Sequence, residues 1–92
     1  AVSNKWKSNS VVAGSITLIY DHHKHNLLKK LTDVQHDYNN AILSSLHFHL
    51  DHDLCMEIIA VKGKANTLNR LADKLISIKG IQHGKLTMTK AD

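Results

Sequence analysis

The spacing of apolar residues changes along this chain, and the order of those changes limits its fold more than any other feature. Alternation with a period of two predicts four strands, at residues 11–20, 41–51, 55–61 and 81–89. A period near 3.6 predicts helices over 27–38 and 65–78, with Asn26 as the N-cap of the first and Gly80 as the left-handed residue after the second. This order is the split βαβ motif. We therefore expect an α+β, ferredoxin-like fold in which a four-stranded antiparallel sheet carries both helices on one face.

Length and composition narrow the kind of protein. Ninety-two residues that are 42% apolar can form one small core, which excludes a multidomain protein. The apolar runs are far shorter than the roughly 20 residues needed to cross a bilayer, and no secretory signal is present. Cys55 is the single cysteine and cannot form an internal disulfide, which favours a reducing interior. We therefore expect a cytoplasmic protein that does not bind membranes, with a linker or tail at 1–10 and a folded domain at 11–92.

Eight histidines in so short a chain point to metal binding. His47 and His49 lie two residues apart in a predicted strand, so their imidazoles leave the same face. A hairpin through the acidic turn at 51–53 would return Cys55 beside them, and its thiolate is a soft, charged donor. A closed site needs a fourth ligand, for which His36, near the end of the first predicted helix, is the candidate. The spacing leaves open whether His36 reaches the same ion within its own chain.

Other polar residues near these donors give weaker signals. Glu57 is the only glutamate and lies two residues beyond Cys55 on the same strand face. There it could accept a proton from a ligand imidazole, or it could be an ordinary solvated residue. Gln35, next to His36, could act in the same way. The loop and turn histidines could form a weak metal site, with His22 as the named candidate, or they could be ordinary loop residues; they are His22, His23, His25 and His52. His83 is interpreted as a turn or edge-strand residue.

Two segments carry a resemblance to a known family. The run 44–57, with the Gln35-His36 pair before it, and the run 72–86 resemble the nickel-responsive transcriptional regulators of the NikR family. The resemblance spans about residues 11–89, and the His-x-His-x5-Cys element is its specific part. It implies that the folded part is the ACT-like, C-terminal metal-binding and tetramerisation domain of such a regulator.

The resemblance also implies a complete ligand set. Three residues of one subunit and one of a neighbouring subunit would bind Ni(II) in a square-planar site at the interface of a homotetramer, supported by Gln35 and Glu57; the ligands are His47, His49 and Cys55, with His36 from the neighbour. Three imidazoles and one thiolate suit square-planar Ni(II) or Cu(II), whereas Zn(II) would draw the ligands toward a tetrahedron. Cu(II) and Zn(II) are therefore alternative ions in vitro.

The chain departs from that family in one large respect. The ribbon-helix-helix DNA-binding domain that precedes this region in the family is absent, so residues 1–10 are interpreted as its trailing end and the chain as a fragment. A net charge of +4 is too modest to indicate nucleic-acid binding by the chain itself. The resemblance thus implies the nickel-sensing domain of a metal-dependent repressor that binds DNA only through the missing domain.

Three other functions are weighed against this one. An ACT-like domain could sense a small molecule at a subunit interface, or the chain could be a stand-alone metal-binding protein. An enzyme with Cys55 as nucleophile and His47 or His49 as base is disfavoured, because three donors on one hairpin suit chelation and no oxyanion-hole loop is evident. We therefore expect no catalytic activity.

Overall fold

The computed structural model describes residues 10–90 and confirms the predicted order of elements. Strand β1 (Val11–Asp21) leads to helix α1 (Leu27–Asp37), and a short 3-10 turn, η2 (Asn39–Ala41), leads into β2. The remaining elements are β2 (Ile42–His49), β3 (Leu54–Lys64), α2 (Ala65–Ile76) and β4 (Ile81–Lys90). Most of the predicted linker or tail at 1–10 lies outside the described residues. Across residues 10–90, no helix combines the length and the apolar character that crossing a bilayer requires.

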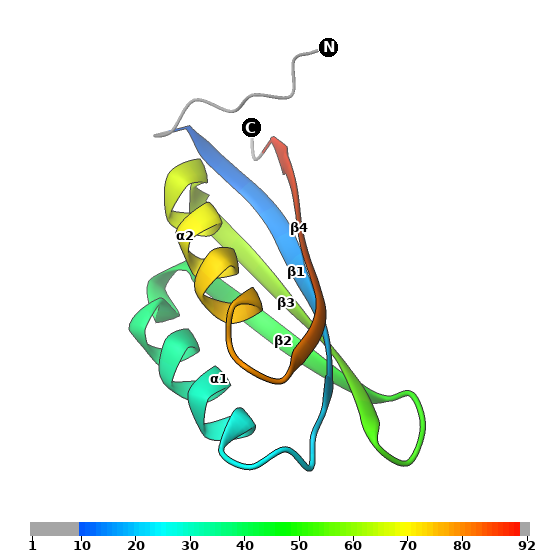
Figure 1. Ribbon diagram of the computed structural model, residues 1–92. Coiled ribbons are helices and arrows are strands. Elements are labelled where there is room, and N and C mark those ends of the chain that lie inside the picture. Colours follow the sequence, from blue (N-terminus) through cyan, green and yellow to red (C-terminus); the bar gives the residue numbers. More distant parts are fainter. Residues whose placement is uncertain (1–9, 91–92) are drawn as a thin grey trace.

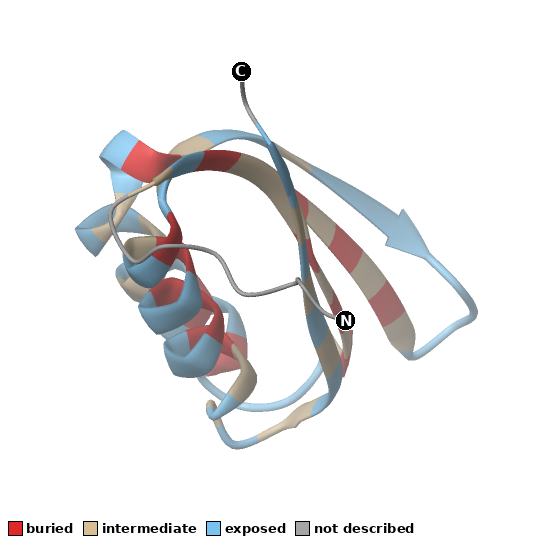
Figure 2. Ribbon diagram, turned by 90° about the horizontal axis from the view of Figure 1, so that it is seen from above, coloured by how far each residue is buried: buried red, intermediate tan, exposed pale blue. Residues whose placement is uncertain are grey.

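The four strands form one antiparallel sheet in the order β2-β3-β1-β4, with both helices on the same face (Figure 1). The core lies between that face and the helices, and β3 shows the expected alternation of buried and half-buried residues along its length (Figure 2). Its inward residues are Cys55, Glu57, Ile59 and Val61. The fold is therefore the predicted α+β, ferredoxin-like sandwich.

Both predicted helices differ from the structure at one of their ends or in the residue that caps them. Helix α1 begins directly after Asn26, but Asn26 has φ 62° and its side chain makes no capping hydrogen bond. Helix α2 ends at Ile76, two residues earlier than predicted. Gly80 does have a positive φ, 110°, yet it lies in the turn before β4 rather than directly after the helix. The sequence thus predicts the left-handed conformation of Gly80, but it predicts neither the positive φ of Asn26 nor the missing side-chain cap.

The edge strand β2 carries its large apolar side chains on the face of the sheet that the helices leave open. The register pairs Leu46 with Ile58 and Phe48 with Met56 on the face away from the helices, so this apolar face is left open. Leu46 is 56% exposed and Phe48 is 44% exposed, and the neighbouring Leu43 and Leu50 are exposed as well. The β2–β3 hairpin also projects away from the helices (Figure 2). The histidines of β2 therefore share the face of the sheet that carries the core.

Candidate metal centre

The β2–β3 hairpin brings together the donors that the sequence singles out. His49 lies directly opposite Cys55, and His47 lies directly opposite Glu57. Residues directly opposite in an antiparallel pair have Cα atoms about 4.5–5.5 Å apart and point to the same face. One imidazole, a second imidazole two residues away and one thiol therefore share a small area at the end of the sheet.

In the single chain, two of these donors have other polar partners: Cys55 contacts the backbone of β3, and His47 lies near Glu57. The thiol of Cys55 is buried and donates a hydrogen bond to the carbonyl of Met56, with Sγ 3.8 Å from the oxygen. Both hairpin histidines are exposed. Among residues 10–90, the ligand atoms of His36, His47, His49 and Cys55 do not form a group of three that all lie within 4.8 Å of one another. The backbone of the hairpin thus pairs the donor residues as predicted, but their ligand atoms are not close enough to one another to share an ion in the single chain.

Below the hairpin histidines lies a buried carboxylate with three partners. Glu57 is 2% exposed, and the Tyr20 hydroxyl donates to its Oε1 at 2.8 Å. The Gln35 amide nitrogen donates to Oε2 at 3.0 Å, and His47 Nε2 lies 3.5 Å from the same oxygen. A buried carboxylate needs such partners, because its desolvation would otherwise cost several kcal/mol. Gln35 and Glu57, the two predicted supporting residues, therefore contact each other, and Glu57 contacts a predicted ligand.

Tyr20 belongs to this network, and sequence reasoning missed it. Tyr20 is the last residue of the alternating run that predicts the first strand, and in the structure it lies there fully buried and directly opposite Cys55. Its burial raises the pKa of the Tyr20 phenol far above its ordinary value of 10.0, and the hydrogen bond to Glu57 and the charge of Glu57 act in the same direction. The signal that could have found it is a polar-tipped residue on the inward parity at the end of a buried strand.

This shift predicts a delayed tyrosine titration. Tyr38→Phe leaves Tyr20 as the only tyrosine in the chain. In the unfolded chain a tyrosine ionises near pH 10, whereas the folded chain keeps Tyr20 protonated. Below about pH 10 the phenol is neutral in both states and has no effect on the pH dependence of stability; above it, stability falls as pH rises. As the pH of the folded variant is raised, its tyrosinate absorbance should therefore increase only when the chain unfolds. In denaturant, the absorbance should increase at about pH 10. A native titration step near pH 10 would contradict this.

His36 lies on α1, away from the hairpin donors. Successive helical residues are about 100° apart around the axis, so Gln35, which reaches Glu57, leaves His36 turned elsewhere. The His36 side chain is exposed and lines a shallow hollow with residues of α1, η2 and β2: Thr32, Gln35, Asn39 and Ile42. His36 is therefore accessible from outside the chain.

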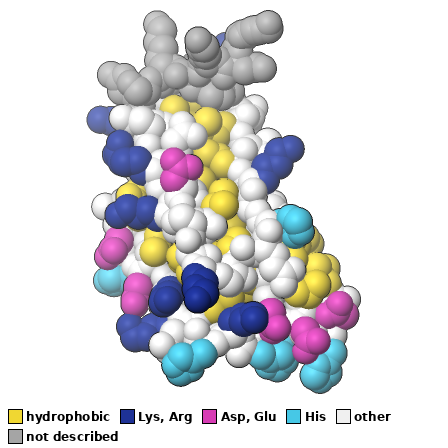
Figure 3. All heavy atoms as spheres, viewed as in Figure 1, with side chains coloured by type: hydrophobic (Ala, Val, Ile, Leu, Met, Phe, Trp, Pro, Cys, Tyr) yellow, Lys and Arg dark blue, Asp and Glu magenta, His cyan; other side chains and the backbone are white. Residues whose placement is uncertain are grey.

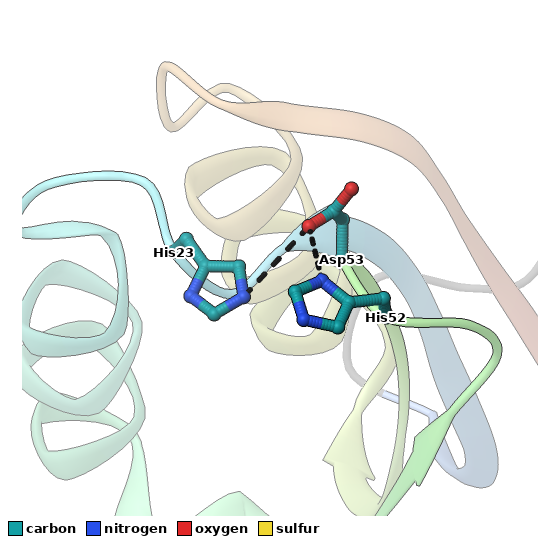
Figure 4. A group of neighbouring side chains, drawn as sticks. All are labelled: His23, His52 and Asp53. Carbon is teal, nitrogen blue, oxygen red and sulfur yellow. Dashed lines mark hydrogen bonds and ion pairs between the residues drawn. The ribbon is translucent and has the colours of Figure 1, made fainter.

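A second group of potential ligands lies at the same end of the sheet, where histidine and acidic side chains gather in the lower part of Figure 3. His23, from the β1–α1 loop, lies beside His52 and Asp53 of the hairpin turn (Figure 4), and one ligand atom of each lies within 4.8 Å of the others. His22 lies next to both groups. The centroid of its ring is 4.0 Å from that of the His23 ring and 5.0 Å from that of the His49 ring. The sequence indicates only a weak metal signal for these loop and turn histidines, with His22 as the named candidate, and it does not predict which of them come together.

Solved structures with this architecture define the class of the fold. An uncharacterized protein from Thermotoga maritima superposes with a TM-score of 0.77 at 16% identity, covering 88% of this chain and 100% of that one. The ACT domain of a GTP pyrophosphokinase from Chlorobium tepidum superposes with a TM-score of 0.70, also at 16% identity, covering 85% and 100%. The fold is therefore ACT-like, as the resemblance implied.

The amino-acid sequence identifies the family within that class. Residues 13–89 match the family described as the NikR C-terminal nickel-binding domain, and this chain belongs to that family. This is a regulatory domain family and not a family of enzymes. The match covers all of α1, β2, β3 and α2.

Full-length relatives agree with the family match. A protein of Solibacter usitatus named "Putative nickel-responsive regulator" is 51% identical over 89 residues, and one of the same name from Thermococcus kodakarensis is 47% identical. Each alignment covers 96% of this chain and 64% of the relative. The chain thus spans less than two thirds of the length of these relatives.

Proposed function

We propose that this chain is the nickel-sensing domain of a metal-dependent transcriptional repressor. Its family is a nickel-binding domain, and its curated relatives are named as nickel-responsive regulators. Those relatives are longer than this chain, which leaves room for the ribbon-helix-helix DNA-binding domain that we place before residue 11. DNA binding would belong to that domain.

The observation that carries the proposal is the pairing of His49 with Cys55 across the hairpin, with His47 two residues away on the same face. Two imidazoles and a thiolate are borderline and soft donors that bind late first-row ions, and a third imidazole would complete a square-planar set for Ni(II). Within that set the buried Glu57 would hold the His47 ring in one orientation. The bound ion would supply strong, directional bonds between these side chains.

The third imidazole in this proposal is His36 of a neighbouring subunit. Its exposure on α1, and the turning of Gln35 rather than His36 toward Glu57, support a ligand that is offered outward. An ion that joins two subunits would favour one quaternary arrangement over others, and a few kcal/mol of preference is enough to operate a switch. In the whole regulator that arrangement would set the spacing of the DNA-binding domains relative to the operator half-sites.

X-ray absorption of the nickel-loaded chain tests the donor set. We expect one sulfur and three nitrogen donors in a square-planar arrangement. The same measurement on His36→Ala should show one imidazole fewer, whereas His83→Ala, which removes an exposed histidine from the opposite edge strand, should leave the spectrum unchanged. A nickel ion without a sulfur donor would contradict the proposal.

The proposed homotetramer makes a further prediction about the open face of β2. Exposed leucines and Phe48 on this face would be covered in an assembly, which supports self-association. Phe48→Glu should shift the chain from a tetramer toward smaller species in light scattering, because a carboxylate in an apolar interface is left without a partner. Thr87→Glu places the same charge on the same face at the opposite edge and should leave the mass unchanged. A monomeric wild-type chain would refute the tetramer.

A further inference from the structure

We propose a second metal site, separate from the hairpin donors, in which His23, His52 and Asp53 bind a divalent transition-metal ion such as Zn(II) or Co(II). These three residues are called the loop cluster below. They come from two loops that are 29 residues apart, counted from His23 to His52, and that meet at one end of the sheet. The proposal does not depend on the function assigned to Cys55.

Two distances in the loop cluster are close to those between neighbouring ligands of one metal ion. His52 Nδ1 lies 3.0 Å from Asp53 Oδ1, and His23 Nε2 lies 3.8 Å from the same oxygen (Figure 4). Metal bonds of about 2.0–2.2 Å to nitrogen and oxygen place neighbouring donors roughly 3.0–3.5 Å apart. Asp53 Oδ1 therefore lies at or near ligand spacing from both imidazoles, and one ligand atom of each of the three residues lies within 4.8 Å of the others.

The backbone on both sides of the loop cluster is held by hydrogen bonds. In the hairpin turn, Asp51 Oδ1 accepts from the backbone N–H of Asp53 at 2.9 Å and of Leu54 at 2.8 Å. In the other loop, Asp21 Oδ1 accepts from the backbone N–H of His23 at 2.8 Å. The two loops are joined by the backbone N–H of His22, which donates to the carbonyl of Asp53 at 3.2 Å. Binding would therefore order side chains on a scaffold that already exists.

The donor set of the loop cluster differs in kind from that of the hairpin. Two imidazoles and one carboxylate are borderline and hard donors, without a thiolate, and the exposure of all three side chains leaves positions for water. Such a set suits Zn(II), Co(II) or six-coordinate Ni(II) rather than a square-planar ion. The absence of a thiolate means that an ion here should show no sulfur charge-transfer band.

The test uses a chain from which the hairpin donors have been removed. The double variant Cys55→Ala, His47→Ala, titrated with Zn(II) by calorimetry, should retain one ion per chain, and its Co(II) form should lack thiolate charge-transfer absorption. Adding His23→Ala or Asp53→Asn should weaken that binding at least about tenfold, because each removes one ligand. The matched control is His25→Ala, which removes an exposed histidine of the same loop that lies outside the cluster.

Three outcomes would overturn the second site. Binding that falls equally in the His25→Ala control would mean diffuse attraction to surface histidines, and binding that survives both His23→Ala and Asp53→Asn would place the ion elsewhere. Paramagnetic broadening by Co(II) should reach the His23 and His52 rings before that of His83, and the reverse order would likewise refute the site. Failure of the hairpin proposal would appear separately, as a wild-type chain whose nickel form lacks sulfur charge transfer.

Discussion

Cys55→Ala should abolish tight nickel binding and the thiolate charge-transfer absorption that accompanies it. Cys55 is the only sulfur donor at the hairpin site and lies directly opposite His49, so the ion loses its one anionic ligand. Removing residues that merely support ligands typically weakens metal binding about 10–100-fold, so loss of the ligand itself should exceed about 100-fold. Calorimetric titration with Ni(II) and the ultraviolet spectrum of the loaded protein measure the two effects.

The fold should survive this substitution. Cys55 is small and buried, and its replacement by alanine removes one sulfur atom from the inward face of β3 at a cost of about 1 kcal/mol. His83→Ala is the matched binding control, because it removes an exposed imidazole from the edge strand on the other side of the sheet. A charge-transfer band in Cys55→Ala, or equal weakening in the control, would count against the hairpin site.

Glu57→Leu is expected to have the largest effect on stability. The leucine leaves the Tyr20 hydroxyl and the Gln35 amide without their shared acceptor, and each unsatisfied group costs about 1–3 kcal/mol. We therefore expect the free energy of unfolding to fall by about 2–6 kcal/mol, measured by urea denaturation at neutral pH. Glu57→Gln keeps an acceptor for Tyr20 and should lose less.

A triple variant separates the two contributions of the Glu57 network. Replacing all three members with apolar residues, as in Tyr20→Phe, Gln35→Met, Glu57→Leu, removes the unsatisfied groups and should recover much of the lost stability. Its nickel affinity should nevertheless stay about 10–100-fold below that of the wild type, since His47 no longer has its carboxylate partner. A triple variant that binds nickel as tightly as the wild type would show that the Glu57 network has only a structural role. A Glu57→Leu variant as stable as the wild type would show that the network does not stabilise the fold.

The inward face of the sheet becomes polar at the end that carries the hairpin donors. Along β3 the inward residues change from Val61 and Ile59 to Glu57 and Cys55, while the outward face of the neighbouring β2 carries exposed leucines and Phe48. A chain selected only for monomer stability would place apolar residues inward at every one of these positions. The inversion supports a function in which the hairpin donors and the open face of the sheet are both used by an assembly.

The sequence alone determines the local features, because they depend on residues that are close in the chain. The two apolar periods specified the strands and helices, and the short acidic turn at 51–53 specified a hairpin that returns Cys55 to the two histidines. Helix ends were less accurate: α2 stops at Ile76 rather than 78, and Asn26 precedes α1 without a side-chain cap. Such boundaries depend on packing as well as on propensity.

Only the tertiary structure decided which distant residues share a site. Tyr20 and Gln35 reach Glu57 from β1 and α1, 37 and 22 residues away, because β3 lies beside β1 and beneath α1. His23 meets Asp53 for the same reason, since the end of β1 and the start of β3 lie side by side in the antiparallel sheet. Periodicity states which residues point inward, but it does not state which strands become neighbours, and that choice depends on burying the whole core at once.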